Sequence, residues 1–164
     1  CTVDSVVKHC ERFDVPLPRI LVEPGRSIVA NAGVTLYTVG ILKTLPNIRK
    51  YVAVDGGMSD NVRTALYHAE YEPIIANKAD QPRTEIVTLC GKHCESGDVV
   101  VVDMPLQHPD LGDIVAVFGT GAYCYSMASN YNGQPRPAIV FVKDGEARVT
   151  TRRETYADLM ARDI

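Results

Sequence analysis

The chain has 164 residues and a formal net charge of -3, and 23% of its residues are charged. This length suits one ordinary domain, or one domain joined to a piece of another. The slight negative charge gives no support for a nucleic-acid or membrane-surface partner, and no apolar run is long enough to span a membrane.

Cysteine usage indicates the compartment. The odd number and irregular spacing of the cysteines argue against the disulfide framework of a secreted protein and favour a reducing cytoplasm. The five cysteines are Cys1, Cys10, Cys90, Cys94 and Cys124. Cys90, His93 and Cys94 are near enough in sequence to be metal ligands, but no second ligand cluster follows, and a structural zinc site takes four ligands. We therefore expect no metal site.

The first 33 residues read as the tail of an α/β unit. Residues 4–13 predict an amphipathic helix capped by Asp4, and a proline-marked loop follows. Residues 19–22 have the pattern of a short buried strand, and residues 27–32 predict another helical segment, closed by Gly33. A parallel strand needs neighbours in its sheet, so we expect the chain to begin in the middle of a larger domain.

From residue 34 onward the sequence has β character. The strand candidates are short and apolar, and Gly, Pro, Asn or Asp residues separate them. They are residues 34–42, 50–54, 73–76, 85–90, 98–102, 113–118, 138–142 and 147–151. Such spacing predicts an antiparallel β-barrel or sandwich. Asp144 and Gly145 mark a hairpin turn, and helices are expected at residues 60–68 and 155–162.

The strongest candidate for chemistry is the turn that carries Cys94 and Glu95. It lies between the apolar runs 85–89 and 99–102, so two strands are expected to hold it rigidly. A carboxylate next to a thiol disfavours the thiolate and leaves a protonated thiol that can donate a proton. The alternative interpretation is a buried structural cysteine followed by a surface turn.

Four further segments carry polar groups for which a functional and a structural explanation can be compared. Residues 23–26 combine a cation with bare backbone, which suits a phosphate, or they form a plain proline–glycine turn. Residues 119–123 form either a glycine-rich site loop that ends in a phenol or a mobile loop with a packed tyrosine. Arg63 and Tyr67, four residues apart on a helix, either clamp a carboxylate or lie on an exposed face. Residues 130–133 are interpreted as a structural turn.

Together these segments resemble the C-terminal part of the diaminopimelate decarboxylases. That family belongs to the pyridoxal phosphate (PLP)-dependent decarboxylases that share a fold with alanine racemase. The matching segments keep the family's order over nearly the whole chain. They are residues 23–26 (Glu-Pro-Gly-Arg), 54–58 (Val-Asp-Gly-Gly-Met), 63–67 (Arg-Thr-Ala-Leu-Tyr), 94–98 (Cys-Glu-Ser-Gly-Asp), 119–123 (Gly-Thr-Gly-Ala-Tyr) and 127–132 (Met-Ala-Ser-Asn-Tyr-Asn).

The resemblance implies a mainly β fold. Residues 34–164 would form a β-barrel or sandwich like the C-terminal domain of alanine racemase. Residues 1–33 would be the terminal α/β segment of a PLP-binding (β/α)8 barrel. The Schiff-base lysine and the glycine-rich phosphate loop would lie outside this chain, so the fragment alone is expected to be inactive. The resemblance also implies a homodimer in which Cys94 and Glu95 reach into the other subunit's active site.

Residue roles follow from the matched motifs as implications of the resemblance. Glu23, Gly25 and Arg26 would shape the cofactor site, with Arg26 at the edge between the cofactor phosphate and the substrate. Tyr123 would contact both cofactor and substrate. One departure from the family pattern is Cys124, which stands where a glycine is expected after the tyrosine.

The remaining implied roles concern the substrate. Arg63 and Tyr67 would bind its distal carboxylate, Glu95 would bind its distal amino group, and Cys94 would donate a proton after carbon dioxide leaves. A substrate that carries both groups at its far end is meso-2,6-diaminopimelate, which gives L-lysine. The alternatives are a related decarboxylase acting on another basic amino acid or a carboxylated polyamine, and a non-catalytic β domain that only dimerises.

Overall fold

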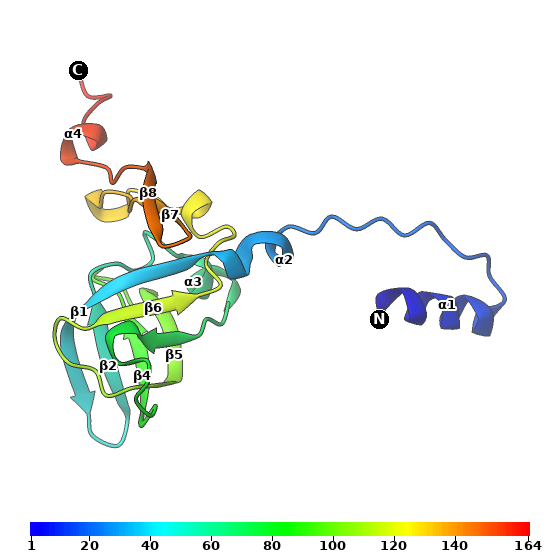
Figure 1. The fold of residues 1–164 in the computed structure, drawn as a ribbon, viewed down its shortest axis with the longest axis horizontal. Coiled ribbons are helices and arrows are strands. Elements are labelled where there is room, and N and C mark those ends of the chain that lie inside the picture. The colour runs from blue at the N-terminus through cyan, green and yellow to red at the C-terminus, as the bar shows by residue number, and fades with distance from the viewer.

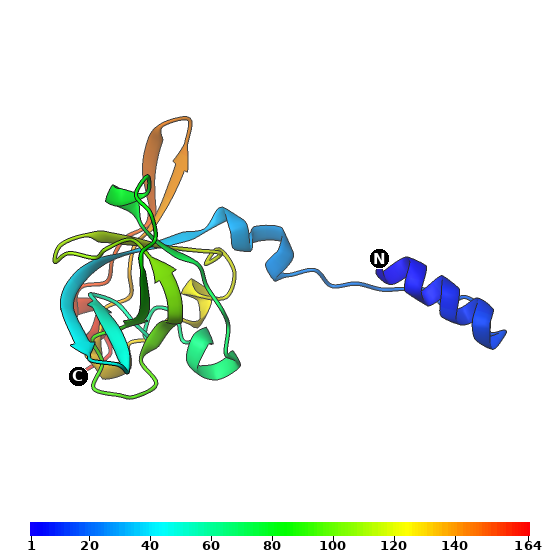
Figure 2. The same cartoon turned by 90° about the horizontal axis from the view of Figure 1, so that it is seen from below.

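The computed structural model describes residues 1–164 and consists of two unequal parts (Figures 1 and 2). Helix α1 (Thr2–Phe13) lies apart from a β domain, and an extended connection joins them. The connection ends at helix α2 (Arg26–Val29) and the 3-10 turn η1 (Ala30–Ala32), and none of these three elements contains a buried residue. The first 25 residues therefore add nothing to the core of the β domain.

The N-terminal part differs from expectation at two points. The first helix is present, but its N-cap is Cys1 and not Asp4. Residues 19–22 form no strand, and Leu21 and Val22 are 77% and 73% exposed. The reason is that a strand needs a neighbour to pair its backbone groups, and this segment has no strand beside it.

A six-stranded sheet, nearly closed into a barrel, forms the body of the β domain. Its strands are β1 (Val34–Leu45), β2 (Arg49–Val54), β3 (Pro73–Ile75), β4 (Glu85–Cys90), β5 (Val99–Leu106) and β6 (Ile114–Phe118). They follow the order β3-β6-β1-β2-β4-β5, and the two outer strands contact each other. All neighbours are antiparallel except β2 and β4. The predicted barrel is confirmed, with one parallel pair that was not expected.

Apolar side chains fill the interior of the barrel. A cluster of 14 buried residues forms the core, and Val52 and Leu89 within it are fully buried. Successive residues of a strand point to opposite faces of the sheet. Thus Tyr37 and Val39 in β1 are buried, while Thr38 between them is not. In β4, β5 and β6, by contrast, two or three consecutive residues are buried.

A two-stranded hairpin projects from the barrel (Figure 2). It consists of β7 (Ile139–Lys143) and β8 (Glu146–Thr151). Asp144 and Gly145 have φ values of 52° and 82°, as a two-residue turn with positive φ at both central positions requires. The predicted hairpin is confirmed. Phe141 and Val142 are nevertheless 63% and 72% exposed, so its apolar side chains have no cover within this chain.

The predicted helices within the β domain are present but shorter. Helix α3 spans Arg63–Tyr67 rather than 60–68, because residues 57–61 form a turn in which the Asp60 amide donates to the Gly57 carbonyl. Helix α4 spans Tyr156–Leu159 and begins with a capping box between Thr155 and Asp158.

Short 3-10 turns complete the domain: η2 (Ala76–Lys78), η3 (Tyr125–Met127) and η4 (Tyr131–Gly133). No helix has the length and apolarity to cross a membrane.

Two glycines join the 26–32 segment to the loop that follows β6. The Gly121 amide donates to the Ala30 carbonyl at 3.0 Å, and the Thr120 amide donates to the Gly33 carbonyl at 3.1 Å. A Cβ atom on Gly33 would overlap the Gly121 backbone, and a Cβ on Gly121 would overlap the Val29 carbonyl oxygen. Only glycine permits this backbone approach. It holds α2 and η1 beside the loop that carries Tyr123.

Gly121→Ala is therefore expected to destabilise the protein by about 1–3 kcal/mol, the usual cost of forcing atoms into a packed contact. The measurement is urea unfolding of both proteins, compared at equal m-values. The matched control is Gly40→Ala, because a Cβ there meets only the Ala53 carbonyl oxygen at an ordinary 3.8 Å. Equal midpoints for Gly121→Ala and the wild type would show that the junction is loose.

Candidate functional site

The turn between β4 and β5 presents Cys94 and Glu95 as the sequence predicts. The Gly91 amide donates to the Asp98 carbonyl at 3.0 Å and closes the base of the turn. Within the turn, the Glu95 amide donates to the His93 carbonyl at 2.9 Å, and the Asp98 amide donates to the Glu95 carbonyl at 3.1 Å. Cys94 is exposed. The interpretation of Cys94 as a buried structural cysteine is therefore wrong.

A buried carboxylate, that of Asp98, fixes the turn from inside. It accepts hydrogen bonds from the backbone amides of Met58 and His93, both at 2.6 Å, and the His93 Nδ1 atom lies 3.0 Å from it. The side chains of Asp98 and His93 are 2% and 1% exposed. His93 thus turns inward while Cys94 faces solvent, and the structure contains no group of three or more His, Cys, Asp or Glu side chains placed to hold a metal ion.

Glu95 has a partner that sequence reasoning missed. The Tyr131 hydroxyl donates a hydrogen bond to the Glu95 Oε2 atom at 2.5 Å. The carboxylate raises the pKa of the Tyr131 phenol. Residues 131–133 do form a turn, as predicted, but that interpretation gave Tyr131 no role. Because the two residues are 36 positions apart, no local pattern in the sequence indicates this contact.

A second group of site residues gathers around Arg63. Its guanidinium carbon lies 5.1 Å from the centroid of the Tyr67 ring and 5.0 Å from that of Tyr123. Contacts of this kind are cation–π interactions. Apart from a 4.0 Å contact from Nη1 to the Met127 sulfur, the guanidinium makes no hydrogen bond or ion pair. Arg63 is therefore held in position by aromatic rings while most of its N–H donors stay uncommitted.

Tyr123 has a backbone conformation that few tyrosines adopt. Its φ angle is 67°, in the left-handed region, which costs a non-glycine residue on the order of 1–2 kcal/mol. Its hydroxyl occupies the space beside Gly25, where any Cβ would overlap it. Gly25, Arg63, Tyr67 and Tyr123 are thus brought together in one group.

Glu23 and Arg26 flank this group without joining it. Both are exposed, and neither side chain makes a hydrogen bond or ion pair within the chain. No hydrogen bond, ion pair or ring contact links the Arg63 group to the Cys94–Glu95 turn either. The predicted residues therefore form two separate groups, connected through the chain between Tyr123 and Tyr131.

Cys124, the departure from the family pattern, is explained by packing. Its φ and ψ angles are -59° and -64°, which any residue adopts, so no glycine is needed. The thiol is buried in the core with its sulfur 3.4 Å from the Tyr71 hydroxyl. Burial raises the pKa of Cys124, so it stays a neutral thiol that anchors the loop.

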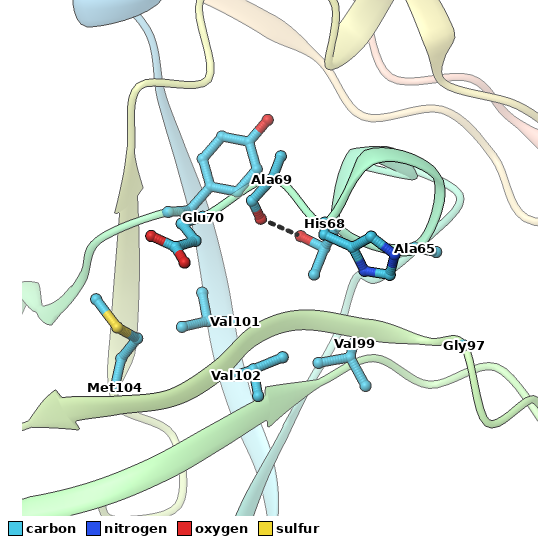
Figure 3. A pocket seen from close by; sticks show the side chains of 11 residues that line it. Ala65, His68, Ala69, Glu70, Gly97, Val99, Val101, Val102 and Met104 are labelled. Carbon is cyan, nitrogen blue, oxygen red and sulfur yellow. Dashed lines mark hydrogen bonds between the residues drawn. The ribbon is translucent and has the colours of Figure 1, made fainter.

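A cavity of about 440 Å³ lies between α3 and β5, and Figure 3 shows its lining side chains. Ala65 of α3 and His68, the residue that caps this helix, face valines of β5 across it. Arg63 and Tyr67 do not line this cavity. One helix therefore carries the Arg63 group on one side and lines a mainly apolar cavity on another.

The sequence is similar to known decarboxylases over nearly its whole length. The family model "Pyridoxal-dependent decarboxylase, C-terminal sheet domain" matches residues 4–121. The chain is 51% identical over 162 residues to the diaminopimelate decarboxylase of Bacillus subtilis and 52% identical over 159 residues to that of Synechocystis sp.. The alignments cover 99% and 97% of this chain but 37% and 34% of those proteins. The chain thus spans little more than a third of the curated relatives it matches.

Solved structures of diaminopimelate decarboxylases also have a similar fold over nearly the whole of this chain. The diaminopimelate decarboxylase from M. jannaschii in co-complex with L-lysine has a TM-score of 0.80 and 38% identity, covering 98% of this chain and 37% of that one. The enzyme from Helicobacter pylori complexed with L-lysine has a TM-score of 0.77 and 32% identity, covering 96% of this chain and 38% of that one.

Proposed function

This chain belongs to the pyridoxal-dependent decarboxylases, as their C-terminal sheet domain, and we propose that it is the C-terminal part of a diaminopimelate decarboxylase. The complete enzyme would convert meso-2,6-diaminopimelate to L-lysine and carbon dioxide. Residues 1–33 would be the terminal segment of the PLP-binding barrel, and residues 34–164 the C-terminal β domain. The Schiff-base lysine would lie outside this chain, which would be inactive alone.

The observation that carries the proposal is the pairing of a cationic group with an anionic group among the site residues. Arg63 contacts the rings of Tyr67 and Tyr123 and has donors left for a carboxylate, and Tyr67 also carries a hydroxyl. Glu95 supplies an exposed carboxylate suited to an amine. A substrate with a carboxylate and an amine at its far end satisfies both, whereas ornithine and arginine lack the distal carboxylate.

The residues around Gly25 fit part of a PLP site. Arg26 has an exposed guanidinium with no partner in the chain, and the Tyr123 hydroxyl lies directly beside Gly25. Arg26 would lie at the edge between the cofactor phosphate and the substrate, and Tyr123 would contact both, while Glu23 and Gly25 would shape this corner. PLP, when bound, supplies the electron sink that makes loss of carbon dioxide possible.

Cys94 would then supply the proton. Its thiol is exposed at the tip of a turn that is held at its base and from within. A donor on a fixed support can deliver its proton to one chosen carbon of the substrate.

A homodimer is proposed for the complete protein. Within one chain no hydrogen bond, ion pair or ring contact joins the Cys94–Glu95 turn to the Arg63 group, and the family resemblance implies that each site receives this turn from the other subunit. The exposed apolar side chains of the β7–β8 hairpin are consistent with burial in an assembly. We place the enzyme in the cytoplasm, where the five free cysteines stay reduced.

The test is decarboxylation by the complete protein, purified with PLP and supplied separately with meso-diaminopimelate, L-ornithine and a carboxylated polyamine. We expect carbon dioxide and L-lysine from the first, with the highest kcat/KM by at least tenfold. A higher kcat/KM for either other substrate would overturn the substrate assignment. No turnover of any of them would favour the non-catalytic dimerising domain.

A further inference from the structure

We propose that Tyr131 is a positioning residue that sets the specificity of Glu95 for an amine, and that the buried His93–Asp98 pair holds Tyr131 in place. This inference rests on the proposed function, in which Glu95 binds the distal amino group of the substrate. It concerns residues to which the family resemblance assigns no role.

The two carboxylate oxygens of Glu95 have different environments. Oε2 accepts the Tyr131 hydroxyl at 2.5 Å, in the range of charge-assisted O–H···O⁻ hydrogen bonds, which are the stronger class. Oε1 accepts no hydrogen bond within the chain. The phenol therefore fixes the direction of the carboxylate and leaves one oxygen for an ammonium group. A tyrosine phenol is protonated at neutral pH and therefore acts as the donor, and the Glu95 carboxylate raises its pKa further.

The Tyr131 ring is itself supported. It stacks on the His93 imidazole with centroids 5.8 Å apart and an interplanar angle of 22°. His93 cannot swing away, because its Nδ1 atom lies 3.0 Å from the buried Asp98 carboxylate. Its other nitrogen, Nε2, is buried without a partner, so the Asp98 contact and the stacking alone orient the ring.

Tyr131 is anchored separately from the turn it supports. Ser129, two residues earlier, donates its amide to the Ser59 carbonyl at 2.9 Å. Asn130 donates its side-chain amide to Glu154 at 2.6 Å and to the Gln134 carbonyl at 3.0 Å. Tyr131 thus approaches Glu95 from a backbone with its own attachments, and it can hold a carboxylate whose own side chain would otherwise rotate freely.

A purely structural role fits poorly. Tyr131 is 44% exposed, so its hydroxyl adds little to the core, and a change there is expected to leave the stability nearly unaltered. The hydrogen bond instead ends on a residue that faces solvent and carries a negative charge. The contact matters only if that charge must point in one direction.

The test uses Tyr131→Phe in the complete enzyme, which removes the hydroxyl and keeps the stacked ring. The ligands are meso-diaminopimelate and 2-aminopimelate, which has the same chain without the distal amine. We expect KM and the calorimetric Kd for diaminopimelate to rise about tenfold, the usual cost of one charge-assisted hydrogen bond, with kcat within about twofold. Binding of 2-aminopimelate is expected to change less than twofold.

Two controls make the result specific. Tyr125→Phe is the same change in the same loop, at a tyrosine that makes no side-chain hydrogen bond, and it is expected to leave both ligands unaffected. In a Glu95→Gln background, Tyr131→Phe should cost much less than it does alone, because the charge it orients is gone. Equal losses for both ligands, or fully additive losses, would refute the inference. A wild-type enzyme that does not bind diaminopimelate would refute the proposed function itself.

Discussion

Replacing Cys94 by alanine is expected to lower kcat of the complete decarboxylase by about 10²–10⁴-fold while KM changes little. A general acid contributes a factor of this size, and the loss of an interaction made only in the transition state falls on kcat. The thiol is exposed, so its removal leaves no cavity in the core and the fold should be unaffected. Steady-state kinetics with meso-diaminopimelate, on protein shown to be folded, provide the measurement.

The matched control is Cys10→Ala, a cysteine on α1 that is remote from the turn in sequence and is expected to leave kcat unchanged. Cys94→Ser adds a second comparison, since a hydroxyl keeps the shape but is a much weaker acid than a thiol, so it should rescue little. Normal turnover by Cys94→Ala would remove this residue from the mechanism and leave the turn with a binding role alone.

Local patterns in the sequence predict most elements of the β domain. Short apolar runs bounded by turn residues placed the strands within a few residues, and the Asp144–Gly145 pair predicted the hairpin turn. The strand expected at residues 19–22 is wrong because its formation depends on partners that this chain does not provide. The parallel pairing of β2 with β4 was not predicted either, since pairing is decided by contacts distant in sequence.

In the candidate site too, local sequence patterns predict some features and miss others. Cys94 and Glu95 stand out in the sequence because a turn between two apolar runs presents them, and the structure contains that turn. The contacts that hold them do not stand out. Tyr131 reaches Glu95 across 36 residues, and His93 is buried only because the turn folds back onto Asp98. Such contacts arise from tertiary packing and leave no periodic pattern in the sequence.

Tyr123 and Arg63 show a third situation, in which the residues are predicted and their arrangement is not. The helix pattern places Arg63 and Tyr67 on one face, and this is confirmed by their 5.1 Å contact. The second ring contact of the guanidinium, with Tyr123 at 5.0 Å, involves a tyrosine with a left-handed backbone. Local preference opposes that conformation, and the surrounding packing must maintain it.

Arg63→Ala is expected to weaken binding of meso-diaminopimelate to the complete enzyme tenfold to a hundredfold. The change removes a charge-assisted contact to the distal carboxylate, which contributes on the order of 1.5–3 kcal/mol. L-Lysine lacks that carboxylate, so its inhibition constant should rise by less than about threefold. Arg152→Ala is the matched control, because it removes the same charge from a guanidinium already paired with Asp158 at 2.6 Å. Equal losses for the two ligands would show that Arg63 only supports the tyrosine rings.

The Arg63→Ala and Cys94→Ala variants together can test whether the site is shared between subunits. In the proposed dimer, each site combines Arg63 of one subunit with the Cys94 turn of the other. A mixed dimer of one Arg63→Ala and one Cys94→Ala subunit would then contain one site with both lesions and one with neither. At a substrate concentration well below KM, where both variants have low activity, mixing them should restore about half of the activity of a wild-type dimer for each mixed dimer formed. If every site were built from a single chain, each would carry one lesion, and mixing would restore nothing. The recovered activity therefore distinguishes a turn that serves its own chain from one that completes the neighbouring site.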